Sequence, residues 1–363
     1  MPTNLGMPKT LIEFLSSGLQ AIIRSQRGIV CVLLEDTVTT EKSIFTYRNL
    51  AEVSEADWDD VNYARLELIF KASPFKVIAV KTTSVSAGLA TIKGLYFQWL
   101  VAPTATVMDK TAITSWIASQ RLLGNLYKAV LTEANTADSE AIVNFSASGI
   151  KVMEGDEEIE ISAADYACRV AGILAALPMN RSITYSELPE MSAIDNIDDK
   201  EGAVNAGKLL IFHDGEKFKF GRGVTSFTSI TPTKGEEFCK IKLMEGMDQI
   251  KRDITYAFDN YYVGKVLNSY QNKKLFCGVV LAYFRELARP EVGVLDNTNE
   301  SFIIVSYEKN KAWLQSHGKY NENMTELQVL TYPTGANAMF DGNIYLVDAM
   351  EDLDLSLFLG GRI

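Results

Sequence analysis

Short runs of apolar residues recur along the first half of the chain, and polar or charged residues bound each of them. Residues 29–34 (IVCVLL), 76–81 (KVIAVK) and 128–132 (KAVLT) are near-continuous apolar runs. Such runs are typical of strands that are buried on both faces, as in a parallel sheet. Further strands are expected at residues 99–102, 141–145, 149–153 and 183–185.

Amphipathic helices are expected between these strands. The pattern predicts helices ending near Lys71, Leu95 and Leu123, and a further helix over residues 163–177 that Ser162 caps. Strands that alternate with helices predict an α/β layer architecture with right-handed crossovers. A hairpin is expected where Asp214-Gly215 separates residues 209–212 from residues 217–220.

The second half of the chain reads as a smaller α+β region. Residues 245–263 carry an apolar stripe at helical spacing, and a second helix is expected over residues 273–288. Strands are expected at residues 302–306 and 344–347.

Both ends of the chain carry a potential strand without an evident partner. Residues 10–15 (TLIEFL) form one short apolar stretch, and Leu353, Leu355, Leu357 and Leu359 alternate strictly with other residues. A terminal strand can pair within its own subunit, or it can add to the sheet of a neighbouring subunit. The pattern alone leaves both arrangements open.

Composition excludes several classes of protein. The formal net charge of −11 is opposite to that of a general nucleic-acid binder. Four scattered cysteines without a C-x-x-C pair indicate reduced thiols, and two histidines are too few for a His-rich metal site. The longest apolar run, residues 276–284, is too short to span a bilayer, and the first residues do not resemble a signal peptide. We expect a soluble cytoplasmic product without membrane insertion or nucleic-acid binding.

Catalytic motifs are incomplete. Residues 202–208 (GAVNAGK) have the spacing of a phosphate-binding loop, but Leu209 replaces the hydroxyl residue that holds Mg²⁺. Residues 221–226 (GRGVTS) start like a dinucleotide fingerprint and lack its third glycine. A Ser-His-Asp triad would depend on His213 or His317, and no G-x-S-x-G elbow occurs. We therefore expect neither an enzyme nor a cofactor. Two classes of protein remain as alternatives: a nucleotide-binding α/β enzyme, and a structural or capsid-associated protein.

Five separated segments resemble the contractile tail sheath family of phages, in the short form found in R-type bacteriocins and defective prophages of Gram-positive bacteria. The family usually has asparagine where Thr225 stands and aspartate where Gln271 stands. The segments occur in the family's order, and they are residues 21–28 (AIIRSQRG), 165–185 (DYACRVAGILAALPMNRSITY), 204–207 with 221–226, 262–273 (YVGKVLNSYQNK) and 347–353 (VDAMEDL).

This resemblance implies a structural subunit of a contractile sheath, which polymerises helically as stacked six-fold rings around an inner tube. It implies a central layered α/β domain of subtilisin-like topology without catalytic residues, and a smaller α+β C-terminal domain. The expected parts are an arm (1–18), the α/β sheath domain (19–244), the C-terminal domain (245–340) and a second arm (341–363). Expected partners are the tube, baseplate and tail-terminator proteins, with assembly in the bacterial cytoplasm and a final place in the phage tail or bacteriocin particle.

The resemblance also gives roles to two groups of residues. Strand exchange between subunits is expected to use Thr10, Leu11, Ile12, Glu13, Phe14, Leu353, Asp354, Leu355, Ser356, Leu357, Phe358 and Leu359. Residues 265–289 carry five basic residues against one acid, which suggests a weak grip on an acidic tube. The candidate tube-facing residues are Lys265, Lys273, Lys274, Arg285 and Arg289.

Overall fold

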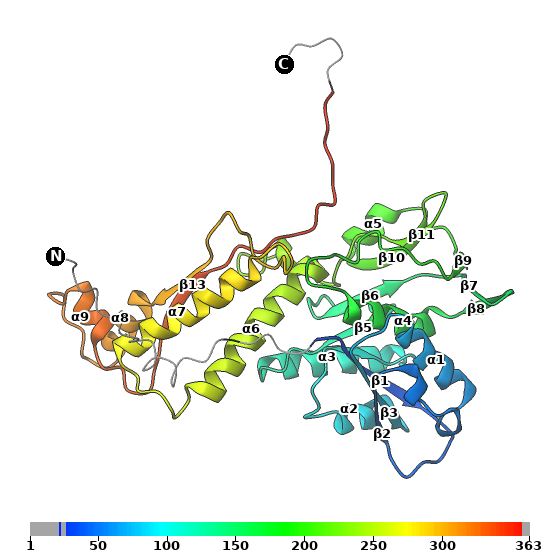
Figure 1. Cartoon of the computed structure of the whole chain (residues 1–363), viewed down its shortest axis with the longest axis horizontal. Helices are drawn as coiled ribbons and strands as arrows, with labels where there is room; N and C mark the ends of the chain where they lie inside the picture. The colour runs from blue at the N-terminus through cyan, green and yellow to red at the C-terminus, as the bar shows by residue number, and fades with distance from the viewer. Residues whose placement is uncertain (1–21, 23–26, 358–363) are drawn as a thin grey trace, which may run out of the picture. The chain divides into compact units, whose positions relative to one another are not determined.

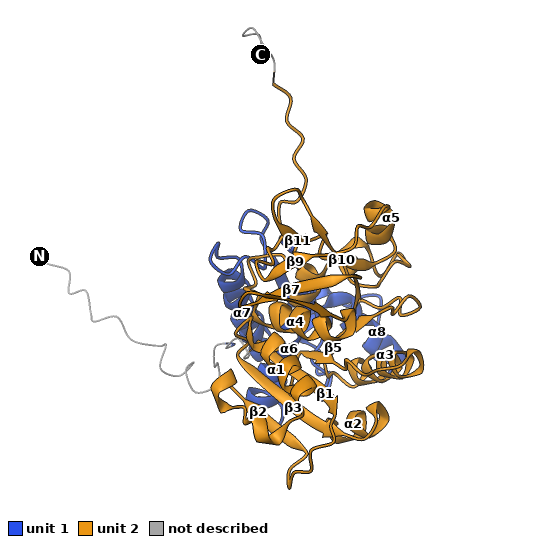
Figure 2. Cartoon of the chain, turned by 90° about the vertical axis from the view of Figure 1, so that its right-hand side faces the viewer, with its two compact units in different colours: residues 1–25, 246–347 blue, residues 26–245, 348–363 orange. Residues whose placement is uncertain are grey.

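The computed structural model describes residue 22 and residues 27–357 of the chain. The chain divides into two compact units, which Figure 2 draws in different colours. The larger unit comprises residues 26–245 and 348–363, and the smaller unit comprises residues 1–25 and 246–347. The boundary falls after Glu245, inside the long helix α6 (Ile241–Tyr261).

A large, mostly parallel sheet forms the centre of the larger unit (Figure 1). Its strands are β1 (Ile29–Glu35), β2 (Ile44–Tyr47), β3 (Lys76–Thr82), β4 (Trp99–Val101), β5 (Lys128–Thr132), β6 (Ile142–Ser146), β10 (Lys208–His213) and β11 (Phe218–Phe220). Their order across the sheet is β11-β10-β6-β5-β4-β1-β3-β2. Only β2 and β11, at the two edges, run antiparallel to their neighbours in this sheet. This arrangement confirms the predicted α/β class and the hairpin at Asp214-Gly215.

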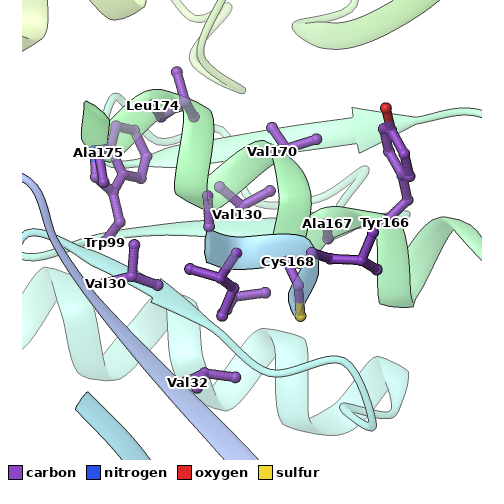
Figure 3. Packing of buried hydrophobic residues seen from close by; sticks show 14 of the residues in the cluster. Val30, Val32, Trp99, Val130, Tyr166, Ala167, Cys168, Val170, Leu174 and Ala175 are labelled. Carbon is purple, nitrogen blue, oxygen red and sulfur yellow. The ribbon is translucent and has the colours of Figure 1, made fainter. Parts of the chain in front are cut away.

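Helices cover both faces of this sheet. Successive residues of each strand point to opposite sides, and both sets of side chains are apolar, so each face needs a covering layer. Val30 and Val32 of β1 belong to one buried cluster, while Cys31 and Leu33 belong to a second cluster. Figure 3 shows the first cluster, in which Val170 of the helix after Ser162 lies beside the sheet. The helices of this unit are α1 (Asp60–Phe70), α2 (Val85–Thr91), α3 (Val107–Leu122), α4 (Ala163–Ala176) and α5 (Lys200–Asn205), with 3₁₀ turns at Leu50–Glu52, Glu55–Asp57 and Glu236–Cys239.

Helix α4 crosses α1 at a very short distance. A Cβ built on Gly172 would lie under 3.0 Å from the backbone oxygen of Ile69, so the two backbones meet at this glycine. Arg65 of α1 forms an ion pair with Asp165 of α4 at 2.6 Å. Arg169, one turn before Gly172, donates from Nε to Glu190 at 2.6 Å. Burial alone would raise the pKa of Glu190, but Arg169 outweighs burial and holds this pKa below its ordinary value.

A small antiparallel sheet has the order β8-β7-β9, from β7 (Ile150–Glu154), β8 (Glu157–Ile161) and β9 (Met191–Ala193). The segment with phosphate-loop spacing has a different structure from a phosphate loop. Residues up to Asn205 complete α5, and Lys208 begins β10. The amide of Gly202 donates to the carboxylate of Asp199 at 2.7 Å, so an acid already caps this short helix.

The smaller unit consists of helices and one two-stranded sheet. Ring contacts join its elements: Phe276 lies 5.6 Å from Phe258 and 5.1 Å from Phe340, measured between ring centroids. Besides the part of α6 after Glu245, its elements are α7 (Tyr270–Leu287), α8 (Tyr307–Ser316), α9 (Glu326–Thr331), β12 (Phe302–Val305) and β13 (Phe340–Asn343). Strands β12 and β13 pair antiparallel.

Two predicted strands are wrong. Residues 183–185 form a turn, in which Ile183 is buried and the amide of Tyr185 donates a single hydrogen bond to the Phe220 carbonyl of β11. Residues 344–347 follow β13, where Leu346 forms only an isolated bridge with Leu295. Ile183 is buried and Leu346 is half-buried, although neither belongs to a regular strand. Sequence periodicity cannot distinguish a buried apolar side chain in a loop from one in a hydrogen-bonded strand.

Candidate assembly site at the C-terminal segment

The C-terminal segment, residues 348–357, is extended and has no regular secondary structure (Figure 1). Leu353, Leu355 and Leu357 are 81%, 64% and 80% exposed. Among residues 27–357, no strand pairs with residues 353–357. In an extended chain, alternate side chains share one face. This part of the chain therefore presents an unpaired backbone with an apolar stripe.

The beginning of this segment is fixed to the larger unit by a set of contacts that we call the C-terminal clamp. Arg222 Nη2 lies 2.5 Å from Asp352 Oδ1, and Lys240 forms an ion pair with Asp348. Glu351 accepts a hydrogen bond from the Thr184 hydroxyl at 2.6 Å and lies 3.4 Å from both Lys240 Nζ and Arg222 Nε. The clamp thus joins three acids to two bases and one hydroxyl.

The contacts of the clamp differ in strength because their exposure differs. The Asp352 side chain is 80% exposed, and pairs of this kind contribute only about 0–1 kcal/mol. The Glu351 side chain is 6% exposed and has several partners, so removing one would leave a buried carboxylate poorly compensated. Burial alone would lower the pKa of Lys240, but Asp348 and Glu351 outweigh burial and raise it. Glu351 is therefore the central residue of the clamp.

Segments that are far apart in the sequence meet at this clamp. Thr184, Arg222 and Glu351 come from three of the five segments on which the family resemblance rests. Close by, Gly207 brings α5 and β10 against residues 225–226, where a built Cβ would lie 2.9 Å from the Thr225 oxygen. The Thr225 hydroxyl donates to the Phe238 carbonyl at 2.9 Å, where the family usually has an asparagine amide.

Sequence reasoning missed the clamp itself. It identified Leu353, Asp354, Leu355, Ser356 and Leu357, which the structure places together on the extended segment. The signal that was available is the acidic charge of residues 348–354, which requires basic partners. Nothing in the pattern indicated which bases those would be. The predicted residues Thr10, Leu11, Ile12, Glu13, Phe14, Phe358 and Leu359 lie outside the described residues.

The predicted basic surface of the smaller unit needs one correction. Lys273 is 4% exposed and donates from Nζ to the Thr334 hydroxyl at 3.1 Å, and burial lowers its pKa. It therefore has no surface position from which to grip a tube. Lys265, Lys274, Arg285 and Arg289 are all exposed, and Arg285 also pairs with Glu300 and Arg289 with Glu286.

The sheet of β12 and β13 is a second unusual feature. Phe302 and Ile304 of β12 are 42% and 52% exposed, so part of this small sheet's apolar surface is open. Each strand has one neighbour among the described residues, which leaves an edge available on both. Two-stranded sheets are marginally stable by themselves and gain stability from further strands.

Within the described ranges, no helix combines the length and the apolar character needed to cross a membrane. The same residues contain no group of three or more His, Cys, Asp or Glu side chains placed to hold a metal ion.

Comparisons with known proteins agree on one family. The family described as phage tail sheath C-terminal domain matches residues 233–340. The chain is 32% identical to the tail sheath protein of Clostridium phage phiCD119, over 96% of this chain and 98% of that protein. The crystal structure of the sheath tail protein from Desulfitobacterium hafniense has a TM-score of 0.67 at 14% identity and covers 77% of this chain and 90% of that chain. The contracted sheath of PVC, an extracellular contractile injection system, has a TM-score of 0.71 at 14% identity over 99% of each chain.

Proposed function

The chain belongs to the phage tail sheath protein family, and we propose that it polymerises helically around an inner tube and contracts to drive that tube through a target envelope. It is a structural subunit of a contractile tail sheath, as the resemblance predicted, and its function is not enzymatic. The observation that carries the proposal is the exposed, unpaired leucine stripe held at its base by the clamp.

Strand addition would connect the subunits. Residues 353–359 of one subunit would add to the edge of the β12–β13 sheet of a neighbour, and residues 10–14 would contribute a further strand. Main-chain hydrogen bonds would supply affinity, and the alternating leucines would cover the exposed apolar side chains of β12. Each fully buried leucine would add about 1.5–3 kcal/mol.

A contact of this kind joins two different surfaces of the same chain. Such heterologous contacts build open helical polymers when the rotation from one copy to the next does not close into a ring. Extended connections would let subunits rotate and move outwards without losing their pairing. The free energy for contraction would come from a larger buried area in the shorter polymer, and no nucleotide would be consumed.

The finer assignments belong to the same proposal. Residues 19–244 would be the sheath domain, with the family's subtilisin-like topology, and residues 245–340 would form the layer facing the tube. Residues 1–18 and 341–363 would be the arms. The polymer of stacked six-fold rings would meet a baseplate at one end and a tail terminator at the other. It would assemble in the bacterial cytoplasm and finish in a phage tail or bacteriocin particle.

Electron microscopy of the purified chain tests the proposal directly. Negative staining should show rods or tubes of constant width, and light scattering should rise above a critical concentration. A homogeneous population of compact particles or small closed rings at every concentration would contradict helical polymerisation. The same sample should not hydrolyse ATP, which separates the proposal from a nucleotide-binding enzyme.

Two exposed lysines, Lys265 before α7 and Lys274 within it, give a prediction about the tube. Replacing Lys265 and Lys274 by glutamate should reduce sheath assembly on isolated tubes at low salt, while tube-free polymers still form. Exposed pairs contribute about 0–1 kcal/mol each, and repetition along the tail makes them effective. Co-sedimentation with tubes measures the effect, and the exposed Lys42 and Lys93 of the larger unit, both changed to glutamate, provide the control. Unchanged binding to tubes would show that this surface does not face them.

A further inference from the structure

The residues just before β1, like the C-terminal clamp, make specific contacts with the larger unit. Arg27 Nη2 lies 2.6 Å from Glu245 Oε2, and Arg27 Nη1 donates to the Leu177 carbonyl at 3.4 Å. Gly28 has a φ of +86°, and a Cβ there would lie 3.1 Å from the Ala175 oxygen. We call Arg27 and Gly28 the N-terminal root, and residues 348–352 the C-terminal root.

Glu245 connects the N-terminal root to the central sheet. Its second carboxylate oxygen lies 2.9 Å from Nζ of Lys128, a β5 residue that is 2% exposed. Burial alone would raise the pKa of Glu245, but Lys128 and Arg27 outweigh burial and hold this pKa low. The carboxylate is thus charged, buried and compensated by two bases, an arrangement that depends on both of them.

The C-terminal root is tied to the same short piece of chain. Lys240, which pairs with Asp348 and Glu351, directly precedes the first residue of α6. The amide of Met244 donates to the Lys240 carbonyl at 3.0 Å, which closes the first turn of the helix. The amide of Ile241 donates to the Gly223 carbonyl at 3.0 Å, next to the clamp residue Arg222.

We propose that Lys240 and Glu245 are positioning residues that tie both roots to the start of α6, so that the two arms leave the larger unit from one jointly held junction. This inference rests on the proposed function, in which both chain ends are arms that link subunits. A helical turn forms and opens cooperatively, so loosening either of its attachments releases the other. Force carried by one arm would then pass to the other arm and to α6 without crossing the hydrophobic core.

Limited proteolysis of the full-length chain, below the concentration at which it assembles, tests the coupling. Trypsin cleavage after Arg27 gives a fragment that starts at Gly28, and glutamyl endopeptidase cleavage after Glu351 gives one that starts at Asp352. Lys240→Gln should raise the first rate about fivefold, although the ion pairs of the Lys240 side chain are with the C-terminal root. Arg27→Gln should raise the second rate by a similar factor, because coupling between two sites is reciprocal.

Matched variants separate coupling from general loosening. Lys234→Gln removes another ion pair of the larger unit, the one with Glu140 at 3.0 Å, and should change neither rate. Lys240→Arg keeps the positive charge and should leave the rate after Arg27 slow, and Arg27→Met, which removes the charge from a side chain of similar length, replaces Arg27→Gln if the latter does not fold. If either cross-effect is absent in a folded variant, the two roots are held independently and the inference is wrong. Because the assay uses unassembled chain, it stands whether or not rods form.

Discussion

Replacing Leu353, Leu355 and Leu357 together by aspartate is expected to abolish polymer formation and to leave a folded monomer. All three side chains are exposed in the single chain, so the fold loses little when they change. In the polymer each leucine would be buried at a strand-addition interface, where it is worth about 1.5–3 kcal/mol. Losing three of them would weaken the contact by roughly 5 kcal/mol, which is more than a thousandfold in affinity.

Light scattering against concentration, together with a thermal melt, measures both parts of this prediction. Asp354→Ser combined with Ser356→Asp changes the opposite face of the same strand, keeps the net charge and should still assemble. Leu355→Pro removes one ladder donor and should give an intermediate defect. A triple variant that polymerises normally would show that this stripe is not an inter-subunit contact. A large fall in melting temperature would show that it packs within the subunit.

The sequence reveals the stripe of Leu353, Leu355 and Leu357 because the pattern lies within a few consecutive residues. Leucines at every second position predict an extended chain with one apolar face, whatever the surroundings. The clamp is different, since Glu351 meets Thr184 and Arg222 across more than a hundred residues. Such contacts depend on how the sheet orders its strands, which no short pattern encodes. Lys273 shows the same limit: a basic residue on a helix reads as exposed until its neighbours in the fold are known.

The central sheet was predictable for a related reason. Strands such as β1 and β5 are buried on both faces, so they need continuous apolar runs that few other structures require. Short strands such as β9 have no such signature, because three residues cannot show a period. The close contact of α4 with α1 was equally hidden, although Gly172 stands inside a segment that the resemblance had singled out.

Gly172→Ala should destabilise the larger unit, although alanine is the better helix former by about 1 kcal/mol. The new methyl group would overlap the Ile69 carbonyl, and backbone cannot turn aside as a flexible side chain does. Separating α1 from α4 would also strain the ion pair of Arg65 with Asp165. We expect a net loss of about 2–3 kcal/mol, equivalent to a fall in melting temperature of roughly 5–10 °C.

Gly278→Ala provides the matched comparison, because the two substitutions are chemically identical and differ only in their surroundings. Gly278 lies inside α7, and nothing lies within 4 Å of a Cβ built there. Helix propensity then acts alone, and this variant should be stabilised by up to about 1 kcal/mol. The larger unit contains three of the four tryptophans, Trp58, Trp99 and Trp116, so tryptophan fluorescence should mainly follow that unit in the Gly172→Ala melt, with the whole-chain helical signal recorded for both variants. Equal stability of Gly172→Ala and the unchanged chain would mean that α1 yields at little cost, so that the close crossing is not what requires glycine at this position.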